Sequence, residues 1–363
     1  MGGLPAWAAA AAGFVIGAAC GFFVRRARLC TFGATESALI GGDWRAMKAF
    51  GLALGLALVG AQTLILAGFL VPAGTTYVAE RLPVLSIALG SILFGLGMSL
   101  VGTCAFGSLT RLGGGDLRSL VVMLTFGAVA FATLRGAIAD LRVALESASL
   151  SLAPHTPSAL PETLRAWTGL DLRVALTLAA GGGLLAVAAA DRRLRAMPRM
   201  LTAAAVLGLA VILGWIVTVS LDDFDAARRI QSLTFVSPVA RTLYAGLMSA
   251  AAWADFGVAS VVGVALGAFL AARRAGEFRW EAFDDAYEMR RHLLGAVLMG
   301  FGGVLAGGCT IGQGLTAGSL MALSWPLALA GMALGARLGI AVLVEGSLRD
   351  VLAGRLARWR DRA

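Results

Sequence analysis

The residues of this chain best suited to chemistry are two cysteines that stand in the same short motif. Residues 93–107 read LFGLGMSLVGTCAFG and residues 298–312 read LMGFGGVLAGGCTIG, so that Cys104 and Cys309 coincide at a constant offset of 205. Each copy ends an apolar segment with glycines, which let the backbone approach a neighbour closely, and then presents one thiol inside Cys-x-x-Gly. The duplication predicts a thiol site built from both copies.

A neutral thiol is a weak hydrogen-bond donor and a soft, polarisable group, so it suits a sulfur atom better than a hard oxyanion. A helix N-terminus adds oriented N–H groups that hold an anion without a buried cation. A third Cys-x-x-Gly begins at Cys30, whereas Cys20 lies inside an apolar span and is interpreted as a packing residue. The pattern favours a small anion with an exposed sulfur atom, and the candidate substrate-binding residues are Cys104, Cys309, Cys30, Gly102, Gly107, Gly307, Gly308 and Gly312.

Composition places these thiols in a membrane. The chain has 363 residues, is 59% hydrophobic and has a mean hydropathy of +0.84. Its net charge of +9 is spread between apolar runs, which is typical of topology signals and not of nucleic-acid binding. No nucleotide-binding loop, Cys-x-x-Cys pair or metal-ligand cluster is present in the sequence. We therefore expect an all-α polytopic membrane protein that is not an enzyme and needs no cofactor.

The apolar runs predict about nine transmembrane helices, each near the roughly 20 residues that a bilayer requires. The positive-inside rule places the N-terminus outside and the C-terminus in the cytoplasm of a bacterial inner membrane, because most arginines follow the odd-numbered spans. The predicted spans are 7–24, 49–71, 84–102, 119–138, 173–190, 200–221, 256–272, 292–307 and 319–345.

Nine spans divide as four, one and four, so the fifth span inverts the second half of the chain relative to the first. Inverted repeats are a common construction of transporters, with the substrate near the midplane. Short segments around the cysteines are predicted to be re-entrant half-helices that line the interior. The predicted organisation is a first repeat at 1–138 with re-entrant segments at 29–40 and 103–118, an external interfacial loop and linking fifth span at 139–199, a second repeat at 200–345 with re-entrant segments at 230–253 and 308–318, and a basic cytoplasmic tail at 346–363.

Residues 298–315, LMGFGGVLAGGCTIGQGL, preceded by GEFRWEAF at 276–283, resemble the YeeE/YedE family of bacterial inner-membrane proteins. The resemblance implies nine spans with half-helices and uptake of thiosulfate, which three central cysteines hand along a path. Cys104 and Cys309 match two of these cysteines, and Cys30 is the candidate for the third. It also implies a cytoplasmic partner, a small sulfur-carrier protein related to TusA.

The sequence thus predicts a transporter that imports thiosulfate or a related small sulfur-containing anion. Two alternatives stay open. A membrane thiol oxidoreductase would need a vicinal pair of redox cysteines, and the chain has no Cys-x-x-Cys. A membrane scaffold for a cytoplasmic sulfurtransferase would keep the fold without moving any solute.

Overall fold

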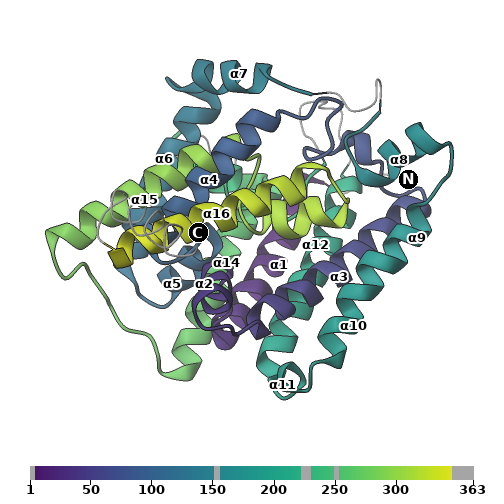
Figure 1. Ribbon diagram of the computed structural model, residues 1–363. Coiled ribbons are helices and arrows are strands. Elements are labelled where there is room, and N and C mark those ends of the chain that lie inside the picture. Colours follow the sequence, from purple (N-terminus) through teal and green to yellow (C-terminus); the bar gives the residue numbers. More distant parts are fainter. Residues whose placement is uncertain (1–4, 151–155, 222–229, 249–252, 346–363) are drawn as a thin grey trace, which may run out of the picture.

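The computed structural model describes residues 5–150, 156–221, 230–248 and 253–345, and within them the protein is helical, with isolated β-bridges and no extended strand (Figure 1). The predicted all-α polytopic membrane fold is confirmed. The helices are α1 (Ala6–Ala27), α2 (Thr31–Ile40), α3 (Arg45–Leu66), α4 (Val84–Val101), α5 (Ala105–Gly113), α6 (Leu117–Arg135), α7 (Ala139–Ser147), α8 (Leu160–Thr168), α9 (Arg173–Thr177), α10 (Gly183–Ala190), α11 (Arg192–Arg195), α12 (Pro198–Val219), α13 (Ser237–Met248), α14 (Phe256–Ala275), α15 (Ala286–Leu305) and α16 (Ser324–Glu345), with a 3-10 turn at Pro72–Gly74 and π-helical turns at Leu178–Gly182 and Gly312–Ala317.

Eight helical stretches of the described chain are long and apolar enough to cross a membrane, against the nine predicted. The remaining predicted span, 292–307, corresponds to α15, which has 20 residues. Its first turns carry Glu288, Arg290 and Arg291, so this helix is less apolar than the others although it packs between α4 and α6.

Each predicted re-entrant segment contains a short helix, too short to cross a bilayer alone. The segments 29–40, 103–118 and 230–253 contain α2, α5 and α13, and 308–318 contains the π-helical turn. Residues 249–252 of the third segment lie outside the described residues, as does the predicted basic tail at 346–363.

The contact between α1 and α14 is made by glycines spaced four residues apart, which place small residues on one face of each helix. A Cβ atom added to Gly17 would collide with the carbonyl of Ser260, and one added to Gly267 would collide with the carbonyl of Ala18. Such small-residue faces let membrane helices approach to backbone contact, where van der Waals packing holds them together. The two helices therefore form a close pair at the centre of the bundle (Figure 1).

The glycines before the two central cysteines have the same packing role, and this identifies the neighbours that they approach. A side chain at Gly97 would meet the backbone of α15, and one at Gly302 would meet the backbone of α4. Gly95 lies against Met332 of α16, and Gly300 lies against the carbonyl of Phe126 on α6. These positions fix the helices that carry the cysteine loops rather than contact a ligand.

The helices from α12 onward repeat the order of those from α1 to α6. α1 packs on α14 while α12 packs on α3, and α4 packs on α16 while α15 packs on α6. Each contact is thus matched by one between the corresponding helices of the other half, as a two-fold relation requires. The inverted orientation of the halves in a membrane, and the domain limits drawn from it, stay predictions.

The linking region contains more helix than the sequence analysis expected. α7 and α8 lie within the predicted external loop, and α9, a π-helical turn and α10 form one stretch that packs on α3 at the edge of the bundle (Figure 1). Arg173 at the start of this stretch donates to the carboxylate of Glu162 on α8 at 2.5 Å and to the amide oxygen of Gln62 on α3 at 2.9 Å. The mostly buried ion pair ties α9 to α8, and the hydrogen bond to Gln62 joins the linking region to the first half.

Candidate functional site

Cys104 is the N-cap residue of α5. Gly102 ends α4 in the left-handed conformation (φ 74°), which glycine adopts without strain, and the chain turns into the cysteine. The backbone N–H of Gly107 then donates to the Cys104 sulfur at 3.3 Å. Sulfur here occupies the place that a serine or aspartate oxygen takes at most helix starts. The turn therefore fixes the thiol at the head of a short helix.

Cys309 is held in the same way in the second half. Gly307 has φ 71°, and the backbone N–H of Gly312 donates to the Cys309 sulfur at 3.4 Å. The intervening Gly308 lies against Gln313, whose side-chain amide donates to the carbonyl of Ala306 at 2.7 Å. The sequence repeat thus corresponds to a repeated local structure.

The loop that begins with Cys30 connects both of these loops. Cys30 is the N-cap residue of α2, and its sulfur lies 3.4 Å from the hydroxyl of Thr103, the residue before Cys104. The next residue, Thr31, is hydrogen-bonded through its hydroxyl to the hydroxyl of Thr310 at 2.9 Å. The structure therefore brings the three predicted cysteine loops together.

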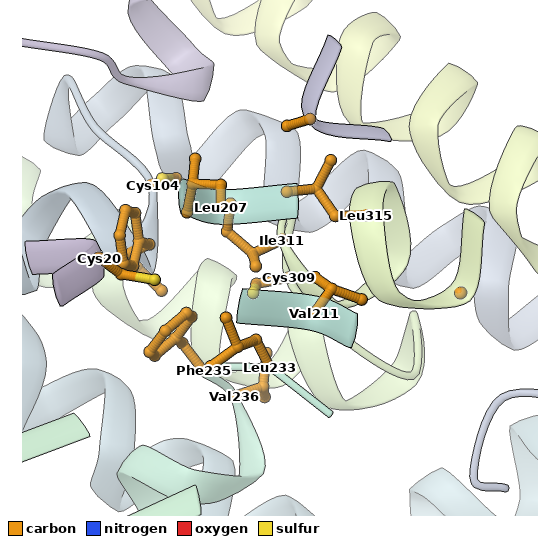
Figure 2. Close-up of a cluster of buried hydrophobic side chains, with 14 of the residues drawn as sticks. Cys20, Cys104, Leu207, Val211, Leu233, Phe235, Val236, Cys309, Ile311 and Leu315 are labelled. Atoms are coloured by element: carbon orange, nitrogen blue, oxygen red, sulfur yellow. The ribbon is translucent and has the colours of Figure 1, made fainter. Parts of the chain in front are cut away.

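The central thiols lie in an apolar core. Cys104 is 1% exposed and Cys309 is 0% exposed. Cys20, on α1, is also fully buried, in agreement with its interpretation as a packing residue. Figure 2 shows all three in one cluster with side chains that include Leu207, Leu233, Phe235 and Ile311. This conformation excludes solvent from both central thiols, so a ligand reaches them only when the structure opens.

Two cavities flank this core. The first, of about 480 Å³, has Cys30, Thr103 and Gly107 in its wall together with several arginines, and we call it the arginine hollow. The second, of about 450 Å³, includes Tyr77, Gly307 and Gln313, and we call it the tyrosine hollow. Each hollow borders one copy of the duplicated motif.

Comparison with known proteins identifies the family. A family model described as sulphur transport matches residues 26–338. The thiosulfate transporter TsuA of Escherichia coli is 30% identical over 336 residues, which cover 89% of this chain and 91% of the relative. The thiosulfate transporter TsuA of Spirochaeta thermophila is 29% identical over 349 residues, covering 86% of this chain and 92% of the relative. The chain belongs to the sulphur transport family.

Several site residues of this sulphur transport protein were missed by the sequence reasoning. Thr31, Thr103 and Thr310 were not selected, although a threonine adjoins each cysteine of the three loops and is visible as such in the sequence. Tyr77 was missed because it lies far from any cysteine along the chain, yet a side chain at Gly312 would come within 2.9 Å of its hydroxyl. Only the fold places this phenol beside the second motif.

The two halves of this family member differ at the position of Cys30. Leu233 stands where the first half has Cys30, and it is fully buried, with its carbonyl accepting a hydrogen bond from Thr316 at 2.6 Å. The neighbouring Phe235 packs on Phe106 of α5 with ring centroids 4.9 Å apart. The arginine hollow therefore borders a thiol, whereas the corresponding position of the second half is an apolar contact between the halves.

Proposed function

We propose that this protein imports thiosulfate or a related small sulfur-containing anion through a central path lined by cysteines, and that it is not an enzyme. The observation that carries the proposal is the meeting of three Cys-x-x-Gly loops between two hollows. The family and the two thiosulfate transporters of similar sequence support the same substrate class.

The proposed path runs from the tyrosine hollow past Cys309, Cys104 and Cys30 to the arginine hollow. Each thiol hydrogen-bonds the terminal sulfur of the anion in turn and stays reduced, so no bond to sulfur forms or breaks. The helix starts behind Cys104 and Cys30 supply N–H groups for the charged oxygens. Soft contacts for sulfur and polar contacts for oxygen would together select thiosulfate over sulfate.

The orientation of the path in the membrane follows from the distribution of charge. In the proposed topology the arginine hollow opens to the cytoplasm of the bacterial inner membrane, because positively charged loops are retained there. An inward-negative potential opposes each negative charge by about 2.3 kcal/mol per 100 mV, so import needs a coupled ion or removal of the product. A TusA-like sulfur-carrier protein at the cytoplasmic face would supply such removal.

The two halves are proposed to be inverted repeats, with the cysteine loops entering from opposite faces. The matched helix contacts of the halves support this arrangement. Because the hollows border equivalent motifs, opening one while the other stays closed would give each side access to the same buried thiols in turn.

Uptake by liposomes that contain only the purified protein tests the proposal. With no membrane potential imposed, we expect labelled thiosulfate to enter down its concentration gradient, with unlabelled sulfate and selenite tested as competitors, and no entry into empty liposomes. A membrane scaffold would give no flux. A thiol oxidoreductase would lose free thiols during turnover, whereas the proposed transporter keeps all four cysteines reduced while uptake continues.

A further inference from the structure

The arginine hollow holds more positive than negative side chains, and its carboxylates already have partners. Arg28 is bound to Glu277 at 2.9 Å. Glu281 is bound to Arg118 at 2.6 Å. Arg111 donates to the carbonyl of Gly102, the turn residue before Cys104, at 3.0 Å. Two other arginines, Arg25 and Arg279, also line the hollow.

Arg25 and Arg279 have no ion pair among the described residues. Arg25 is partly buried, and its Nε atom is buried without a hydrogen-bond partner in the described chain. Its guanidinium lies over Gly114, where an added Cβ would come within 2.6 Å of a terminal nitrogen. Arg25 lines the hollow, so the positive charge of its guanidinium, which no ion pair in the described chain neutralises, favours an anion there.

The segment 276–281 fixes the position of Arg279. The N–H of Arg279 donates to the carbonyl of Gly114 at 3.2 Å, and the N–H of Glu281 donates to that of Gly115 at 3.1 Å. The carbonyl of Glu281 accepts from Leu117 at 2.8 Å. The segment is therefore held against the junction of α5 and α6, beside the wall that contains Cys30.

We propose that the arginine hollow is a binding site for a small divalent oxyanion, in which Arg25 and Arg279 hold the oxygens and Glu277 competes with the anion as an internal counter-ion. This inference rests on the proposed function, and it makes the hollow the last binding site that the anion occupies before its release into the cytoplasm. Arg28, Arg25 and Arg199 surround Glu277, and the hydrogen bond from Arg28 is the main reason why the pKa of this carboxyl lies below its ordinary value. Glu277 is thus an anion already present where the substrate would bind.

Binding of radiolabelled thiosulfate to the purified protein, with sulfate as a competitor, tests the site. Arg25→Gln and Arg279→Gln should each weaken binding of both anions about fivefold, as expected for loss of one partly solvated charge contact, and Arg25→Lys should recover part of the loss. Glu277→Gln should strengthen binding about two- to fivefold. Cys30→Ser should weaken thiosulfate only, since sulfate presents no terminal sulfur.

Matched controls lie beside the tested residues. Arg26 is exposed and its guanidinium lies 5.7 Å from the ring centre of Phe22, so Arg26→Gln should leave binding unchanged. Asp284 is an exposed acid of the same loop, so Asp284→Asn is the matched control for Glu277→Gln and should leave binding unchanged. The protein should bind thiosulfate equally in purely zwitterionic nanodiscs and in nanodiscs that contain anionic lipid. If the hollow were instead a site for lipid headgroups, anionic lipid would displace the thiosulfate.

Two outcomes would overturn the site: Arg25→Gln and Arg279→Gln binding thiosulfate as Arg26→Gln does, or anionic lipid displacing the labelled anion. Failure of the proposed function is a different result, namely no thiosulfate uptake by the wild-type protein in liposomes. Wild-type uptake together with unaltered binding by the arginine variants would reject only the release site.

Discussion

Serine and alanine in place of Cys104 separate its observed role as a helix cap from its proposed role in binding the anion. Its sulfur caps α5 by accepting from Gly107 at 3.3 Å, and on the proposed function its thiol also binds the sulfur of the anion. Serine is among the best N-cap residues, whereas alanine at such a position costs about 1 kcal/mol. Cys104→Ser should therefore keep the thermal stability of the wild type, and Cys104→Ala should lower it.

Uptake should not follow that order. A serine hydroxyl is smaller and harder than a thiol and does not replace its soft contact with sulfur, and alanine has no donor at all, so neither variant should restore the contact with the anion. An anionic group left without its partner in the apolar core costs about 1–3 kcal/mol, which is a loss of about 5- to 150-fold in transport efficiency. The assay is thiosulfate uptake by liposomes, with melting of the detergent-solubilised protein measured in parallel.

The comparison of the two variants decides between the roles. If Cys104→Ser transported as well as the wild type while Cys104→Ala failed, the cysteine would be a helix cap and the thiol path would be refuted. The same pair of variants at Cys309, whose sulfur accepts from Gly312, provides an independent copy of the test in the second half.

Three further predictions concern the fold. Gly17→Leu would collide with α14 and should abolish recovery of folded protein, whereas Gly183→Leu on α10, with nothing within 4 Å, should be recovered normally by size-exclusion chromatography in detergent. Arg173→Gln leaves its carboxylate partner on α8 alone in a mostly buried site and should destabilise the protein by about 3 kcal/mol, measured as a lower melting temperature. The Lys48 ammonium lies 2.5 Å from Asp191 and holds the pKa of that carboxyl below its ordinary value. The ion pair therefore stabilises the protein above about pH 4 and is lost as the pH falls through the lowered pKa, so the difference in melting temperature between the wild type and Asp191→Asn should shrink below about pH 4.

The fold was predictable because long apolar runs have few structures open to them in a bilayer. The duplicated motif also predicted that both central cysteines follow the same kind of turn, because the same local sequence forms the same local structure in each half. The glycine signal was ambiguous. Gly102 and Gly307 make the turns, but Gly97 and Gly302 pack between α4 and α15, and spacing alone does not show which helix a glycine faces.

The rest of the site depends on contacts between distant parts of the chain. The hydrogen bond between Thr31 and Thr310 joins the two halves, and no local pattern announces it. The arginine hollow exists because the segment 276–281 folds back onto the start of α6. Charges in that segment were interpreted from the sequence as topology signals, which says on which side they lie but not that they enclose a cavity.

On the proposed function, the differences between the halves give the two ends of the path different affinities for the anion, whereas the gradients and removal of the product decide its net movement. The matched helices enclose two hollows of similar size, and each hollow borders its own copy of the Cys-x-x-Gly motif. A path with equal ends would bind the anion equally from each side. In this chain the arginine hollow adds Cys30 and two arginines without an ion pair among the described residues, while Leu233 occupies the matching place in the other half. On the proposed function, positive charge beyond the last thiol draws the anion out of the apolar core, and Glu277 then displaces it, so that binding at the final station does not become too tight for release.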